Sequence, residues 1–196
     1  MAEKNKVKFG LRNVRIASVT ETVSTTGDIV TTYGTPKAYV GAVSLSLSPE
    51  GDTTKEYADD GIWFSQASNG GYSGTLEMET LDEDFEKNYL GCFEDDNGVI
   101  VEDSNLVQKF FAMTFQVSGD VHAKKYVLYR CQATRPDIQA NTKGESVSFD
   151  HSTLNINVLS RPDDGLIKAH TPDGDTTSST YTGWDTAIYV PTVTTN

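Results

Sequence analysis

The 196-residue sequence lacks the features by which several common classes of protein are recognised. It has no run of about 18 consecutive apolar residues, and residues 1–10 lack the apolar core of a signal peptide. We therefore expect a soluble protein that is made in the cytoplasm and has no membrane partner. It has only two cysteines, Cys92 and Cys131, and no CxxC motif or Cys/His cluster. These cysteines could in principle pair, but in a cytosolic product we expect free, half-buried thiols and no zinc site.

Basic residues are also scarce. The chain has 16 Lys and Arg residues against 28 Asp and Glu residues, a formal net charge of −12. This balance argues against wrapping of nucleic acid, which needs a basic face to displace counterions. The charge is uneven, since residues 1–15 carry five basic groups and one acidic group, whereas residues 82–103 carry nine acidic groups and one lysine. The two segments are either solvated faces of opposite sign or complementary ends that join subunits head to tail.

No sequence pattern supports an enzyme or a cofactor site. The three histidines are scattered, residues 71–74 fail the spacing of a nucleophile elbow, and no Walker or Rossmann glycine pattern occurs. The many carboxylates raise the alternative of a glycosidase, but most of them fall in predicted turns and on polar strand faces. An EF-hand is excluded, because placing Gly98 sixth puts Phe93 and Ser104 where carboxylates are required. Calcium binding by the acidic loops stays open.

Alternation of apolar and polar residues predicts five antiparallel β-strands and a mainly β fold. The apolar series are Val43/Leu45/Leu47, Tyr72/Leu76/Met78, Phe111/Met113/Phe115/Val117, Val127/Tyr129/Cys131 and Leu154/Ile156/Val158. Four of them alternate with small or polar residues, so we expect sheets with one face on a core and the other in water. For the strand around Val127 we expect both faces to be covered. Residues 95–98 predict a turn, with positive φ at Asn97 and Gly98.

One short α-helix is predicted at about residues 81–90. Thr80 and Glu83 form a capping-box pattern, and Gly91 is a typical C-terminal stop. Leu81, Phe85 and Tyr89 recur at helical spacing and are expected to pack on a sheet. We expect a long inter-strand loop at about residues 49–71. Residues 1–170 are interpreted as one β domain, and the threonine-rich residues 171–196 as a C-terminal arm with a few aromatic and apolar anchor residues.

Five segments of the chain resemble one protein family. They are Gly41–Thr54 with the acidic, aromatic run from Tyr57 to Phe64, Val7–Val14, Asp82–Phe85, Asn97–Asp103 and Val127–Pro136. The chain thereby resembles the major tail proteins, or tail tube proteins, of phages with long non-contractile tails, in the group found in phages of Gram-positive bacteria. The segments span roughly the first 160 residues in the expected order, and none of them is specific by itself.

This resemblance implies a fold and a function. The fold is an antiparallel β-sandwich or half-barrel of the tail tube type, with one short helix packed against it. The function is structural: hexameric rings stack head to tail into a tube through which genome DNA passes without specific binding. The implied partners are other copies of the chain, a tape-measure protein, a tail terminator and baseplate or distal tail proteins. The implied location is the virion tail, assembled in the cytoplasm of the bacterial host.

The lining of such a tube should lack basic residues and be negative, because like charge keeps the phosphate backbone away from the wall. Polar strand faces without lysine or arginine fit this requirement, although an ordinary solvent-facing side has the same composition. The candidate lumen residues are Ser44, Ser46, Ser48, Ser73, Thr75, Glu77, Glu79, Thr153, Asn155 and Asn157. The candidate subunit and ring contacts are Lys6, Lys8, Arg12, Tyr57, Asp59, Asp60, Trp63, Phe64, Trp184 and Tyr189.

Other functions remain open from the sequence. In a carbohydrate-binding β-module, Trp63, Tyr72 and Trp184 would form an exposed platform for stacking on sugars. A hydrolytic virion protein would use the carboxylates instead. A related ring-forming tail component, such as a terminator or a baseplate hub, would make rings without long tubes.

Overall fold

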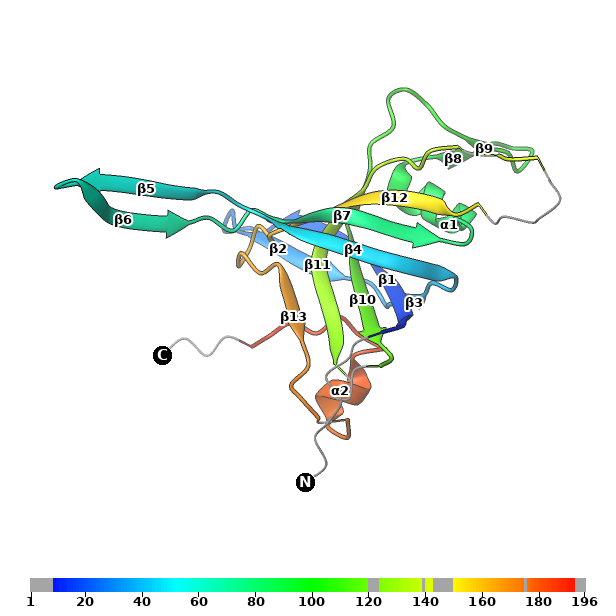
Figure 1. Cartoon of the computed structure of the whole chain (residues 1–196). Coiled ribbons are helices and arrows are strands. Elements are labelled where there is room, and N and C mark those ends of the chain that lie inside the picture. Colours follow the sequence, from blue (N-terminus) through cyan, green and yellow to red (C-terminus); the bar gives the residue numbers. More distant parts are fainter. Residues whose placement is uncertain (1–8, 120–123, 139, 143–149, 175, 193–196) are drawn as a thin grey trace.

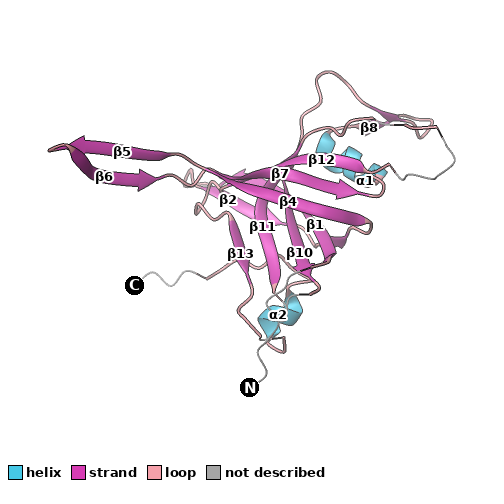
Figure 2. Cartoon of the chain, viewed as in Figure 1, coloured by secondary structure: helices cyan, strands magenta, loops and turns pink. Residues whose placement is uncertain are grey.

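The computed structural model describes residues 9–119, 124–138, 140–142, 150–174 and 176–192 and has a mainly antiparallel β architecture (Figure 1). The strands are β1 (Leu11–Val23), β2 (Ile29–Tyr33), β3 (Lys37–Ala38), β4 (Ala42–Glu50), β5 (Thr53–Ala58), β6 (Gly61–Ala67), β7 (Gly71–Met78), β8 (Phe93–Glu94), β9 (Ile100–Val101), β10 (Phe111–Val117), β11 (Lys125–Ala133), β12 (Ser152–Leu159) and β13 (Lys168–His170). The helical segments are α1 (Glu83–Phe85), η1 (Glu86–Leu90) and α2 (Ser179–Gly183). Figure 2 shows α1 and α2 at separate ends of the strand-rich body.

Nine strands form one sheet in the order β2-β1-β10-β11-β12-β7-β4, with β3 paired to β1 and β13 paired to β11. The two ends of β11 have different partners on one side: residues 130–133 pair with β12, and residues 126–128 pair with β13. The sheet therefore divides along β11, and β12, β7 and β4 continue over the other strands (Figure 1). A side chain at Gly74 in β7 would collide with the carbonyl of Ser46 in β4, so this close approach requires glycine.

The larger of two hydrophobic clusters lies where the sheet folds over itself. Leu76 and Met78 of β7 and Leu154 and Ile156 of β12 are almost fully buried, as their alternation predicts. They belong to the same cluster as residues of β1 and β10, which come from the other half of the sheet. Phe85 of α1 is also in this cluster, in edge-on contact with Phe111 of β10 at a centroid distance of 5.4 Å. The helical segment thus covers the core, as expected.

Three local details differ from the predictions. The helix runs over residues 83–90 and is α-helical only in its first three residues, and its N-cap is Asp82, which accepts a hydrogen bond from the Asp84 amide, instead of Thr80. A bulge between Ala42 and Ser44 leaves Val43 40% exposed, and Ala42 packs against the core in its place. In the turn at residues 95–98, Gly98 has a positive φ of 82° and Asn97 does not.

The predicted loop at residues 49–71 is wrong. These residues form the antiparallel β5–β6 hairpin, which continues from β4 and β7 and projects away from the body (Figure 1). Asp59 and Asp60 make its two-residue turn with φ values of 49° and 60°. Left-handed conformation at both positions is that of a type I′ turn, whose twist matches the twist of the paired strands. The length of the segment predicted a loop, whereas the Asp59-Asp60 pair forms the turn of a hairpin.

The C-terminal residues, interpreted as an arm with a few anchor residues, pack on the sheet. Trp184 and Ile188 are buried against Ala112 of β10 and Val127 and Tyr129 of β11, where they form a second cluster. The face of β10 that carries Ala112, Thr114 and Gln116 was expected to be wet, but all three residues are buried. Both faces of β10 and β11 are thus covered, and the prediction for β11 is confirmed.

Candidate functional site

The polar residues predicted from alternation lie side by side on three neighbouring strands. β7 pairs with β4 on one side and with β12 on the other, in registers that place polar residues opposite one another. Three rows result, each running from β4 through β7 to β12: Ser44–Glu77–Thr153, Ser46–Thr75–Asn155 and Ser48–Ser73–Asn157. We call these nine residues the polar wall. Glu79, the tenth predicted residue, lies one residue beyond β7 and is exposed.

The polar wall is half-buried to exposed and contains no basic side chain. Its opposite face, with Leu76 and Ile156, is buried in the core, so the wall is the open side of these strands. Within it, the Ser44 hydroxyl donates to Glu77 Oε2 at 2.7 Å and holds that carboxylate against the sheet. The alternation of β4 extends the same face to Glu50, a residue that falls within the predicted loop at residues 49–71. A glutamate therefore lies toward each end of the wall.

Strand β4 leaves one edge of the sheet open. Among the described residues it pairs only with β7, although it is nine residues long. Its free edge has Pro49 near one end and no lysine, the residue that commonly protects an exposed edge. An edge of this length with backbone donors and acceptors unpaired is a template for a strand of another chain.

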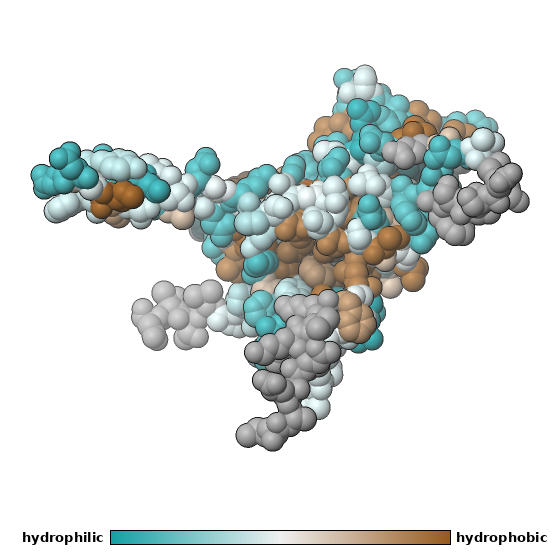
Figure 3. All heavy atoms as spheres, viewed as in Figure 1, coloured by the Kyte–Doolittle hydropathy of each residue, from teal (hydrophilic) through white to brown (hydrophobic). Residues whose placement is uncertain are grey.

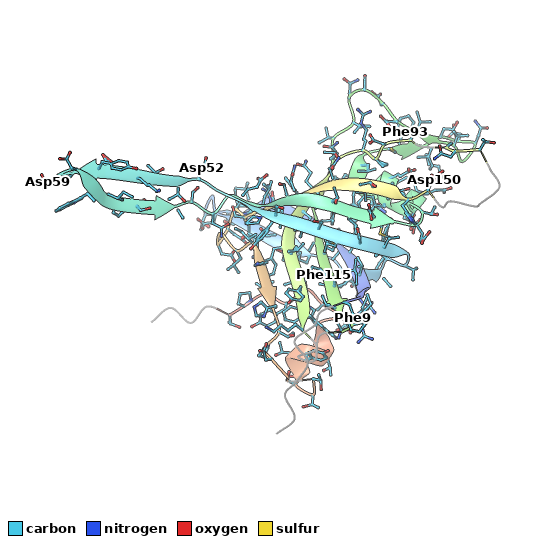
Figure 4. All side chains as sticks on the ribbon, viewed as in Figure 1. Phe9, Asp52, Asp59, Phe93, Phe115 and Asp150 are labelled. Carbon is cyan, nitrogen blue, oxygen red and sulfur yellow. The ribbon has the colours of Figure 1, made fainter. Side chains whose placement is uncertain are left out.

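The hairpin carries five of the ten predicted contact residues. Every residue of β5 and β6 is exposed, including Tyr57 (69%), Ile62 (55%), Trp63 (73%) and Phe64 (57%). Figure 4 shows Asp52 near the base of the hairpin and Asp59 at its tip, far from the sheet. A two-stranded hairpin is marginally stable alone in water, so this one gains from burial against another surface. Ile62 was not selected from the sequence, where an isolated isoleucine in a presumed loop gives no signal.

The predicted basic contacts are only partly described. Lys6 and Lys8 lie outside the described residues. Arg12 is exposed at the start of β1, and no carboxylate of the described part of the chain forms an ion pair with it. In the acidic segment, by contrast, Lys87 pairs with Glu94 at 2.9 Å, and Arg135 pairs with Glu102. Part of the acidic charge is thus already neutralised within the chain.

Trp184 was predicted to contact another subunit, but its side chain is buried within its own chain. This side chain is 2% exposed, stacks on Tyr189 at a centroid distance of 5.1 Å, and donates from Nε1 to the Tyr126 carbonyl at 3.3 Å. Tyr189 is 38% exposed and covers it. Trp184 is therefore an internal anchor, and it cannot form an exposed sugar-stacking platform with Trp63.

The described residues offer no site for catalysis by a metal. No group of three or more His, Cys, Asp or Glu side chains among them is placed to hold an ion.

Both cysteines are free; Cys131 is buried and Cys92 is partly buried. Burial raises the pKa of both thiols, and for Cys92 the neighbouring Glu86 adds to the rise. Asp95 accepts hydrogen bonds from the Val99 and Asn97 amides, which lower its pKa and commit it to its own turn.

Comparison of the chain with known proteins gives no assignment. No protein-family model matches the sequence, and no curated protein matches it significantly. Within the ranges that the structure describes, no helix has the length and apolar character needed to cross a bilayer.

Proposed function

We propose that this protein is a structural subunit that polymerises into a tube, with the polar wall facing the lumen. The observation that carries the proposal is the polar wall itself: three adjacent strands present nine aligned polar side chains, none of them basic, on the uncovered side of the sheet. A surface that must let DNA slide past without binding needs this composition, because cations on it would bind phosphates.

The free edge of β4 supports polymerisation. Pairing of this edge with a strand of a neighbouring subunit would continue the polar wall from one subunit to the next and remove the exposed edge. In this arrangement each subunit contributes a half-barrel, the finer fold that the resemblance to tail tube proteins implies. Closure of six such subunits would form a ring, and stacking of rings would form the tube.

The projecting hairpin supports contact beyond the pairing of strands. Aromatic side chains are the usual hot spots of protein interfaces, and Tyr57, Trp63 and Phe64 are presented away from the body. Under this proposal the partners are further copies of the chain and, by resemblance, a tape-measure protein, a terminator and baseplate or distal tail proteins. The place of action is the virion tail, and the protein has no enzymatic role.

Electron microscopy of the purified chain at rising concentration is the first test. Hollow rings or tubes are expected, and a monomer that never assembles would refute the proposal.

The lumen assignment is tested by adding positive charge to the wall. Ser48→Lys/Asn155→Lys places two lysines at exposed wall positions in different rows. Assembled variant tubes are expected to retain double-stranded DNA in a salt-dependent and nuclease-protected form, whereas wild-type tubes retain none. Thr32→Lys, at an exposed position of β2, is the matched control. Equal retention by the wall variant and this control would show that the wall is not the lumen.

A further inference from the structure

An apolar groove opens on the side of the body below β4. It has a volume of about 280 Å³ and is lined by Phe9, Gly10, Leu11, Leu45, Leu47, Phe115 and Val117. We call it the seam groove, because it separates β4 from the start of β1. Figure 3 shows apolar atoms gathered below β4, and Figure 4 places Phe115 and Phe9 in that region.

The seam groove has firm walls. Phe115 stacks on Tyr126 at a centroid distance of 5.0 Å with nearly parallel rings, which fixes one side. The backbone of Phe9 accepts a hydrogen bond from the Gly119 amide, and its ring lies so close to Gly119 that a side chain there would collide with it. Phe9 nevertheless remains 65% exposed. An apolar hollow with an exposed aromatic rim is suited to an apolar side chain from outside.

Its size and chemistry limit the occupant. Pockets for drug-sized ligands usually measure about 300–1,000 Å³ and contain several polar groups, whereas the seam groove is smaller and lined only by apolar residues. It thus has room for one or two side chains of a protein. The same chain presents a matching group at the hairpin tip, where Ile62, Trp63 and Phe64 are more than half exposed.

The hairpin of the same subunit does not fill the groove. All residues of β5 and β6 are exposed, so they are not buried in their own chain. A projecting knob and a hollow at different places on one chain fit together between copies, and such heterologous contacts propagate into rings or filaments.

Charge favours the same pairing. Arg12 is exposed, directly follows the groove residue Leu11 in the chain, and has no ion-pair partner among the described residues. The hairpin turn consists of two exposed aspartates, Asp59 and Asp60. Insertion of the tip into the groove would bring opposite charges together at the rim, which steers association.

We propose that the hairpin tip of one copy inserts Trp63 into the seam groove of another copy, while Ile62 and Phe64 contact the rim of the groove. This inference rests on the proposed self-assembly, in which the hairpin tip would be the inserted surface and the seam groove the receiving surface.

Complementation between two defective variants tests it. Trp63→Asp removes the knob, and Phe9→Asp adds charge to the groove; both side chains are mostly exposed, so both variants are expected to fold. Each variant alone is expected to need at least tenfold more protein to assemble. Mixed, they are expected to form pairs, because the intact tip of one fits the intact groove of the other. Val40→Asp, at a 90% exposed apolar position outside both surfaces, is expected to assemble like wild type.

Disulfide trapping gives the second readout. With Cys92→Ser and Cys131→Ala as background, Ile62→Cys in one chain and Phe9→Cys in the other are expected to cross-link on oxidation. If the wild-type chain forms tubes but the cysteine variants do not cross-link and the two aspartate variants do not complement each other, the inference is overturned and the proposed function stands. A wild-type chain that never assembles would overturn both.

Discussion

Replacing each of the two tryptophans by alanine should distinguish the role of the C-terminal segment in folding stability from the role of the hairpin in assembly. Trp184 is packed under Tyr189 against β10 and β11, and its indole N–H donates to the Tyr126 carbonyl. Lys125 Nζ, at 2.6 Å from Asp185, holds the adjoining residue. Trp184→Ala therefore leaves a cavity beneath a segment that covers one face of β10 and β11.

The magnitude follows from burial. Removing a fully buried aromatic side chain typically costs about 3–5 kcal/mol of unfolding free energy, and Trp184 is 2% exposed. For a protein of this size each kcal/mol lowers Tm by about 2–4 °C, so we expect a fall of about 6–20 °C. Trp63 is 73% exposed, and Trp63→Ala should change the unfolding free energy by no more than about 0.5 kcal/mol.

Thermal and urea unfolding, followed by far-ultraviolet circular dichroism below the assembly concentration, would measure both variants. Trp63→Ala is expected to unfold like wild type and to fail in assembly, whereas Trp184→Ala is expected to be unstable as a monomer. An unchanged Tm for Trp184→Ala would refute the conclusion that residues 176–190 are part of the folded body.

Three further predictions concern stability and reactivity. Hydrogen bonds from Arg161 lower the pKa of Asp163, so its stabilising contribution is complete above about pH 4 and is lost as pH falls further; Asp163→Asn should flatten this part of an acid-unfolding curve. Burial raises the thiol pKa of Cys131, so at pH 8 it should react with a thiol reagent only in denaturant, and Cys92 should react slowly in the native protein. Leu154→Ala should cost about 2–5 kcal/mol in urea unfolding, because the side chain is fully buried; a cost below 1 kcal/mol would contradict the core assignment.

The polar wall could be predicted from sequence because its information is local. Apolar and polar residues alternate over residues 72–78 of β7, except at Gly74, and over residues 153–158 of β12, so the buried and open faces follow from the period of two. The pairing of β7 between β4 and β12 was not encoded locally. Once the strands pair with their apolar faces on one core, however, the polar residues must lie together on the other side.

The predictions that failed depended on distant contacts or small backbone changes. The bulge beside Ala42 turns Val43 outward without altering the alternation that is visible in the sequence. The aromatic residues of the hairpin and of the C-terminal segment have the same composition, yet Trp63 is exposed and Trp184 is buried. Only the position of the segment against β10 decides which tryptophan is an anchor of the fold.

The C-terminal segment also determines which side of the sheet is available for function. By alternation alone, β10 and β12 each have one apolar face and one small or polar face, and either could be a wall. Trp184 and Ile188 cover this second face on β10, where Thr114 and Gln116 become buried, and no described residue covers the corresponding face on β12. The charged partner of the segment is Lys125, whose ammonium group would be out of place on a surface that, under the proposed function, must not bind phosphate. By burying this cation and covering β10, the segment leaves β4, β7 and β12 as the broad strand surface that is open, polar and without basic side chains.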